Sequence, residues 1–145
     1  MFAITGRIRT GVGAAGQTLA HQLPHIAKEF PEVASCHPAT INVELDSPLL
    51  VLAPDHRTRP IAWLPGNPKH ESFDLLRVEL EAPADGPRVP AWIYISYASP
   101  HRRTPHMHEI ITTKLDLAGV ETCRLRINRS VVQMPWVQFP ALVIV

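Results

Sequence analysis

Apolar and polar residues alternate with a period of two along much of this chain. Successive side chains of a β-strand point to opposite faces, so the alternation predicts strands that turn one face to a core. Turn-forming pairs such as Pro65-Gly66 and Asp85-Gly86 separate the alternating segments. Five segments have this alternation or a strand-like content of β-branched and aromatic residues, at positions 4–10, 40–45, 76–81, 92–97 and 123–127.

One segment follows the helical period instead. Its apolar residues recur at positions i, i+3, i+4 and i+7, which are Leu23, Ile26, Ala27 and Phe30. Pro24 suits the first turn of a helix, and Pro31 is expected to end it. The pattern therefore predicts one short helix within about residues 24–30.

These elements predict a mainly β chain that forms one small β-barrel with one or two short helices. The length of 145 residues suits a single domain. We expect the barrel over residues 1–129 and an apolar C-terminal extension of the same domain over residues 130–145. The apolar end of that extension needs burial, so we expect a monomer or a homodimer formed through this tail.

Composition narrows the functional classes. Hydrophobic residues make up 46% and charged residues 19%, which excludes a disordered chain. The net charge of +1 does not suggest a nucleic-acid or membrane-surface protein. The N-terminus lacks the pattern of a signal peptide, and no apolar run reaches the roughly 20 residues of a membrane helix. A cytoplasmic location is therefore expected.

A glycine-rich segment follows the first predicted strand and precedes the predicted helix. Glycines let backbone N–H groups approach and wrap an anion, so the loop from Gly11 to Gly16 is a candidate phosphate site. The segment lacks the Lys-Ser/Thr ending of a Walker loop. The alternative is a tight turn that only connects strand and helix.

The second predicted strand carries two neutral oxygen ligands. Thr40 and Asn42 lie two residues apart and project from one face, opposite the apolar row of the same strand. Mg²⁺ needs few protein oxygens when nucleotide phosphates supply the remaining charge. These residues are candidate magnesium ligands, and the alternative is an edge strand whose polar face meets water.

The segment 99–111 concentrates three histidines, two arginines and a carboxylate. His106, His108 and Glu109 are residue types that bind metals, although strand geometry places the histidines on one face and Glu109 on the other. Arg102 and Arg103 are candidates for neutralising a phosphate. Two alternatives stay open, namely a metal-dependent enzyme built on the histidines and a solvated loop.

Taken in this order, the segments resemble the CTP-dependent riboflavin kinase family of archaea. The family's Gly-x-Gly loop corresponds to Gly11-Val12-Gly13, and its Pro-Gly-Thr-Leu-Asn-x-x-Leu strand corresponds to residues 38–45. Its late Glu-Ile-Ile-Ala-Pro segment corresponds to Glu109-Ile110-Ile111 followed by two threonines. The similarity spans about residues 4–127 and depends on order and spacing.

The resemblance implies a Greek-key barrel of the cradle-loop type. It implies transfer of the γ-phosphoryl group of CTP to the 5′-hydroxyl of riboflavin, which gives FMN and CDP with Mg²⁺ as cofactor. The magnesium ligands would be Thr40 and Asn42, and the flavin-binding residues would be Ser99, Thr104 and Glu109. The nucleotide-binding residues would be Gly11, Val12, Gly13, Ala14, Ala15, Gly16, Lys114, Leu115, Asp116 and Leu117. With the arginines, the catalytic set becomes Glu109, Arg102 and Arg103.

The chain departs from the family in its glycine-rich loop. The family's Gly-Glu-Gly is Ala14-Ala15-Gly16 here, so one carboxylate is missing. This loss favours the alternative of a non-catalytic protein of the same fold that binds a nucleotide or another small molecule.

Overall fold

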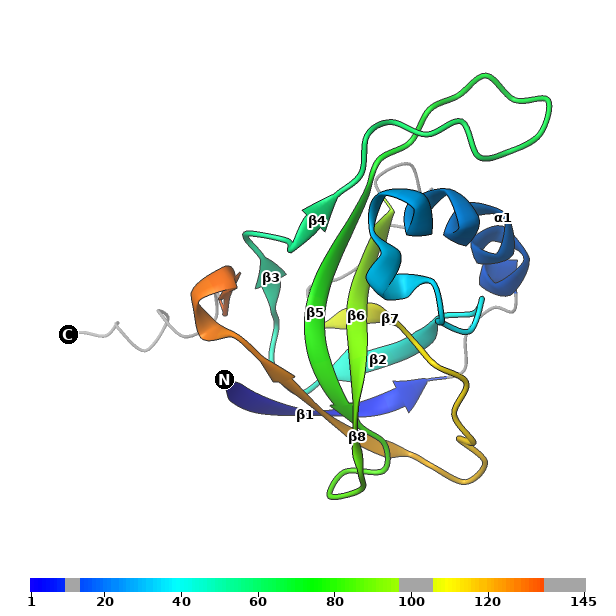
Figure 1. Cartoon of the computed structure of the whole chain (residues 1–145). Coiled ribbons are helices and arrows are strands. Elements are labelled where there is room, and N and C mark those ends of the chain that lie inside the picture. The colour runs from blue at the N-terminus through cyan, green and yellow to red at the C-terminus, as the bar shows by residue number, and fades with distance from the viewer. Residues whose placement is uncertain (10–13, 97–105, 135–145) are drawn as a thin grey trace.

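Six antiparallel strands close into a barrel in the part of the chain that the structure describes (Figure 1). The structure is a computed structural model that describes residues 1–9, 14–96 and 106–134. Around the barrel the order is β5-β6-β7-β2-β1-β8, and β8 pairs again with β5. The strands are β1 (Phe2–Arg9), β2 (Ile41–Leu45), β5 (Phe73–Glu81), β6 (Arg88–Ser96), β7 (Met107–Thr112) and β8 (Thr122–Ile127). This confirms the predicted mainly β fold with a small barrel.

Short elements complete the described chain. The two-residue strand β4 (His56–Arg57) extends the barrel sheet beside β5. β3 (Leu50–Val51) pairs with β9 (Val132–Gln133), so the start of the predicted C-terminal extension lies against the segment that follows β2. Two short 3₁₀ helices span Pro31–Val33 and Arg129–Val131.

The helix is longer than its period predicted. α1 spans Ala14–Glu29, so the predicted segment 24–30 covers only its second half. Pro24 lies inside the helix on its solvent side, where the missing N–H costs one backbone hydrogen bond without disturbing the packed face. That face begins at Leu19, which is fully buried. Ala14–Gly16, the last part of the predicted phosphate loop, form the first turn of α1, and phosphate binding by residues 11–16 stays a prediction.

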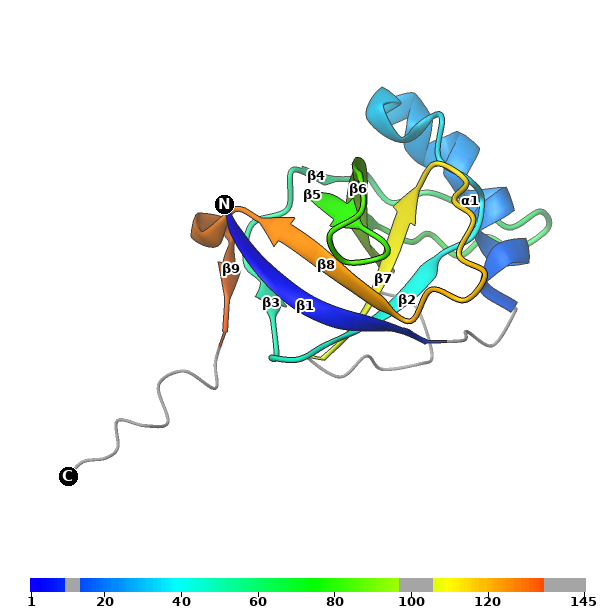
Figure 2. The same cartoon turned by 90° about the horizontal axis from the view of Figure 1, so that it is seen from below.

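Two hydrophobic cores lie on opposite sides of the sheet. Inside the barrel, the alternating residues of all six strands pack together, including Val43, Leu80, Ile93, Ile110 and Leu125. The second core lies between α1 and the outer face of β5, β6 and β7, and includes Leu19, Ile26, Phe73, Trp92 and Ile111. Figure 2 shows α1 outside the barrel, on the side of these strands. The outer core fixes the helix relative to the barrel.

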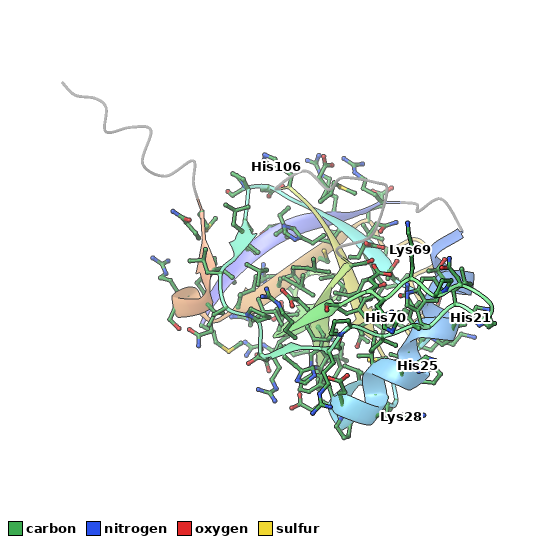
Figure 3. The ribbon with its side chains drawn as sticks, turned by 90° about the horizontal axis from the view of Figure 1, so that it is seen from above. His21, His25, Lys28, Lys69, His70 and His106 are labelled. Carbon is green, nitrogen blue, oxygen red and sulfur yellow. The ribbon has the colours of Figure 1, made fainter. Side chains whose placement is uncertain are left out.

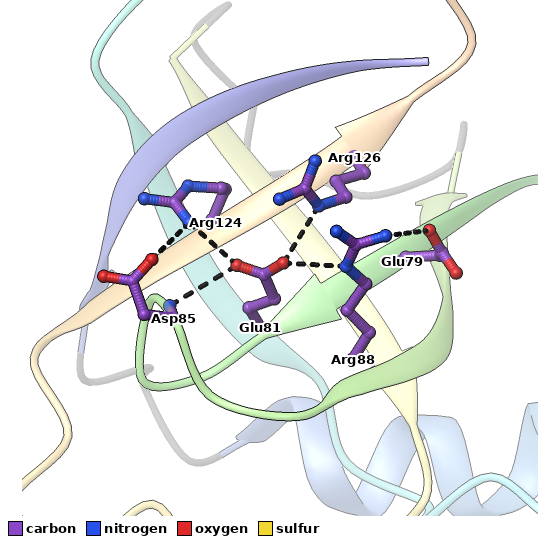
Figure 4. Close-up of polar contacts among 6 residues, drawn as sticks. All are labelled: Glu79, Glu81, Asp85, Arg88, Arg124 and Arg126. Atoms are coloured by element: carbon purple, nitrogen blue, oxygen red, sulfur yellow. Dashed lines mark hydrogen bonds and ion pairs between the residues drawn. The ribbon is translucent and has the colours of Figure 1, made fainter.

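The buried carboxylate of Glu81 connects three strands, β5, β6 and β8, through hydrogen bonds from arginines. Glu81, at the end of β5, has 3% of its surface exposed. Its Oε2 accepts hydrogen bonds from Nε of Arg126 at 2.9 Å and of Arg88 at 3.1 Å, and its Oε1 accepts one from Nη1 of Arg124 at 3.0 Å (Figure 4). The Arg126 hydrogen bond is the main reason that the pKa of Glu81 falls from 4.5 to about 2, with further lowering by the Asp85 backbone N–H and by Arg88 against the opposing effect of desolvation.

We predict that Glu81 makes the fold sensitive to acid. A carboxyl group whose pKa falls on folding stabilises the folded state above its unfolded pKa, and this contribution is lost as the pH falls from about 4.5 towards 2. Glu81→Gln should lower the thermal midpoint at neutral pH and flatten the fall of stability across that window. Thermal unfolding followed by circular dichroism at several pH values measures both effects.

Glu79→Gln is the matched control, because the Glu79 side chain is 42% exposed and lies 3.9 Å from Arg88. It should change the pH profile little. An unchanged acid profile in Glu81→Gln would show that the arginine cluster does not set acid stability.

Candidate functional site

Three residues of the predicted site meet on the outer face of β2 and β7. Asn42 is the register partner of Glu109, and directly opposed residues of antiparallel strands project from the same face. Thr40, directly before β2, donates a hydrogen bond from Oγ1 to Oε1 of Glu109 at 3.3 Å. The adjacent residues Val43 and Ile110 point into the barrel core. The barrel therefore places Thr40, Asn42 and Glu109 on its exterior.

The donor set fits a hard cation such as Mg²⁺. It offers a hydroxyl, an amide carbonyl and a carboxylate, and these are oxygen ligands of the kind that Mg²⁺ prefers. The Thr40 hydroxyl donates its hydrogen to Glu109, so the lone pairs of the hydroxyl oxygen point away from that carboxylate. All three residues are half-buried. With one carboxylate in the set, the site suits a cation that arrives with nucleotide phosphates.

An ion pair borders this face. Arg9, the last residue of β1, pairs in register with Asn42. Its Nε and Nη2 donate to Oε1 of Glu44 at 2.8 and 2.5 Å, and Glu44 lies two residues beyond Asn42 on the same face. The pair neutralises both charges and ties β1 to β2 beside the candidate ligands. Sequence analysis missed it, because the two positions are recognisable as neighbours only when the strand register is known.

The elements on either side of the glycine-rich segment lie at the same end of the barrel. β1 ends at Arg9 and α1 begins at Ala14, and both termini lie on the side of the barrel where β2 starts (Figures 1 and 2). Gly11, Val12 and Gly13 lie outside the described residues. The first turn of α1 has no acidic residue, and the partial positive charge of a helix N-terminus favours an anion there. The described elements that flank the predicted phosphate segment, β1 and α1, thus end and begin on the side of the barrel where β2 starts.

The connection from β7 to β8 leaves the barrel on this side too. The N–H of His37, which precedes β2, donates to the carbonyl of Thr112 at the end of β7 at 2.7 Å. In the predicted nucleotide segment beyond it, Lys114 is exposed, Leu115 packs against the barrel core, and Asp116 accepts a hydrogen bond from the N–H of Ala118 at 3.1 Å. Nucleotide binding by residues 114–117 stays a prediction.

The predicted residues of the segment before β7 have no described position. Ser99, Arg102, Arg103 and Thr104 lie outside the described residues, so their roles also stay predictions.

The histidines of that segment separate from Glu109. His108 is the register partner of Val43 and is 7% exposed, so it faces the barrel interior, as the predicted strand alternation requires. Nδ1 of His106 lies 3.1 Å from the carbonyl oxygen of Leu45. Within the described ranges, no three histidine, cysteine, aspartate or glutamate residues are grouped so that they could hold a metal.

A buried hydrogen bond links α1 to the strand beside Glu109. Tyr94 of β6 is the register partner of Glu109, and its hydroxyl donates to Oε1 of Gln22 on α1. Gln22 is 2% exposed and Tyr94 is 5% exposed. A polar contact at this depth helps to align the helix on the sheet, because buried polar groups are stable when they have hydrogen-bond partners. The sequence signal for this contact is the polar Gln22 within the apolar face of the helix.

Comparison with known proteins does not assign the chain to a group. It matches no protein-family model and no curated protein. Within the described ranges, no helix combines the length and the apolar character needed to cross a membrane.

We predict that Gln22 and Tyr94 are energetically coupled. Tyr94→Phe should destabilise the fold by about 1–3 kcal/mol, because it leaves the buried Gln22 amide oxygen without its donor. Gln22→Met should cost a similar amount. The double variant should lose clearly less than the sum of the two single losses, as expected for residues in direct contact. Urea unfolding of the four proteins measures this difference, and additive losses would contradict the coupling.

Proposed function

We propose that the chain is a magnesium-dependent phosphotransferase that moves the γ-phosphoryl group of CTP to the 5′-hydroxyl of riboflavin. The proposal combines the resemblance to the archaeal riboflavin kinases with one observation. Thr40 and Glu109, which are 69 positions apart in sequence, are in hydrogen-bond contact on a face that also carries Asn42. The residues that the resemblance assigns to metal and acceptor are thus neighbours, as phosphoryl transfer between two bound substrates requires.

Each group on this face has a distinct proposed role. Thr40 and Asn42 would hold Mg²⁺, which when bound neutralises charge on the nucleotide phosphates. The Glu109 carboxylate would accept a hydrogen bond from the acceptor and orient it. Backbone N–H groups of residues 11–16 would hold phosphates, and Arg102 or Arg103 would neutralise the phosphoryl group in transit. Such a site works mainly by positioning and charge neutralisation, and needs no covalent intermediate on the protein.

The bond changes are those of a simple displacement. The 5′-hydroxyl oxygen of riboflavin forms a bond to the γ-phosphorus of CTP, and the bond from that phosphorus to the β–γ bridging oxygen breaks. CDP leaves with the electron pair of that bond, and the hydroxyl proton passes to solvent. Thr40 would link the metal to the acceptor. Its hydroxyl donates a hydrogen bond to Glu109, which would orient the acceptor, and the same hydroxyl oxygen would bind the cation.

A non-catalytic binding protein of the same fold is the second candidate. It is favoured by Ala15, which stands where the family has a glutamate, and by the absence of any acidic residue in the first turn of α1. Such a protein would bind the nucleotide with Mg²⁺ without transferring phosphate.

We predict that Asn42→Ala lowers kcat/KM for FMN formation about 10–100-fold, the loss expected when a metal site is impaired. The fold should stay intact, because the Asn42 side chain leaves the face opposite the barrel core. The assay incubates the purified chain with CTP, Mg²⁺ and riboflavin and separates FMN by chromatography. Excess Mg²⁺ should restore part of the lost rate.

Thr5→Ala is the control, because it truncates an exposed polar residue of β1 away from this face, and it should change the rate by less than about twofold. Binding of CTP with Mg²⁺ but no FMN from the wild-type chain would favour the second candidate. Absence of both binding and turnover, or full activity in Asn42→Ala, would overturn the proposed site.

A further inference from the structure

The ion pairs among the described residues contain arginine or histidine and no lysine. Arg9, Arg57, Arg77, Arg88, Arg124 and Arg126 each contact a carboxylate. Among the described residues no lysine takes part in an ion pair, and two of the chain's three lysines, Lys28 and Lys69, lie on one side of the molecule (Figure 3). Uncompensated positive charge therefore gathers in one region, although the chain as a whole is nearly neutral.

The first part of this region is the solvent side of α1. His21, His25 and Lys28 follow one another at i, i+4 and i+7, which places them along one side of the helix. His21 and Lys28 are exposed and His25 is half-buried. This side is opposite the apolar face of Leu19, Leu23 and Ile26 that packs on the barrel.

The second part is the long connection between β4 and β5, residues 58–72, which is held against α1. The N–H of Arg59 donates to Oε1 of Glu29 at 3.1 Å, and Ile61 and Trp63 pack against the outer core that includes α1. Lys69 and His70 are exposed on this connection. Figure 3 shows them on the same side of the molecule as His21 and His25. We call His21, His25, Lys28, Lys69 and His70 the basic surface.

The carboxylates beside the basic surface already have partners. Glu29 of α1 lies 3.3 Å from Nε2 of His56 on β4 and also accepts the Arg59 N–H. Glu71 is buried and accepts hydrogen bonds from Nε1 of Trp63 at 2.8 Å and from the hydroxyl of Ser96. Arg59 is exposed and adds positive charge at the start of the connection. Three exposed permanent cations, Lys28, Lys69 and Arg59, therefore stand against the two carboxylates Glu29 and Glu71, so positive charge is in excess on this side.

An exposed apolar side chain lies on the same connection as Lys69 and His70. Leu64 is 42% exposed and is followed by the Pro65-Gly66 turn, where Gly66 has a φ of 76° that suits glycine. Figure 1 shows the connection projecting away from the barrel beyond β4. An exposed leucine on a connection that also carries basic side chains can anchor an apolar residue of a partner beside charge pairs.

We propose that the basic surface binds an acidic segment of a partner protein, with Leu64 as the apolar contact. The charge is too small for the other polyanions. An anionic bilayer is typically bound by clusters of about 4–8 lysines or arginines, and here the permanent charges are Lys28, Lys69 and Arg59. Nucleic-acid binding also relies on many basic side chains, whereas the arginines in the described ion pairs are neutralised by carboxylates.

The test measures fluorescence anisotropy of a fluorescein-labelled peptide of repeating Glu-Glu-Leu triplets, in EDTA so that metal does not bridge the histidines. Lys28→Glu with Lys69→Glu should weaken binding about tenfold or more, because attraction becomes repulsion. Arg7→Glu with Arg129→Glu makes the same change in net charge at exposed positions outside the surface, and should change affinity less than about twofold. Leu64→Ser should weaken binding about threefold or more.

A second pair of variants removes the two lysine charges without reversing them. Lys28→Gln with Lys69→Gln, expected to lose about threefold, serves if the charge reversal prevents folding. Absence of peptide binding, equal losses in both double variants, or tighter binding of duplex DNA or phosphatidylserine vesicles through the same lysines would overturn the proposal. These outcomes are independent of FMN formation.

Discussion

The pairing of β2 with β7 is the constraint on which the candidate site depends. The two strands are far apart in the chain, and their antiparallel register sets Asn42 opposite Glu109 and Val43 opposite His108. The alternation of side chains then sends Asn42 and Glu109 outward and Val43 into the barrel core. A shift by one residue would reverse both assignments and bury the polar pair. The hydrophobic core therefore fixes the geometry of the polar face.

The strands β5, β6 and β7 are buried on both faces, and this burial fixes α1, the second element beside the candidate site. The inner faces of these strands fill the barrel, and their outer faces carry α1 through Leu19, Ile26 and the Gln22–Tyr94 hydrogen bond. The two elements that flank the proposed phosphate segment are thus fixed, the end of β1 by the β1–β2 register and α1 by the outer core.

The sequence predicted the parts of the fold in which one face is buried, and it failed where burial was two-sided or depended on register. The strands around Val43 and Leu125 alternate between apolar and polar residues. The start of β5 lacks this alternation, because four successive residues are all buried, namely Phe73, Asp74, Leu75 and Leu76. Pro24 suggested a helix start, although tertiary packing extends the helix through it. Glu81 belonged to the polar row of β5, and its burial depends on arginines from β6 and β8. Strand alternation placed Thr40 and Asn42 on one face, whereas the proximity of Glu109 to them was implied by the resemblance alone and required the β2–β7 register.

The proposed function requires that the outer face of β2 and β7 binds a magnesium nucleotide. The most direct measurement is a titration of the ¹⁵N-labelled chain with CTP and Mg²⁺, followed by NMR. Binding at this face should cause saturable shifts of the backbone amides of Thr40, Asn42 and Glu109 and of the first turn of α1, with smaller shifts when either component is omitted. Saturable shifts confined to other parts of the barrel, or no shifts at all, would contradict it.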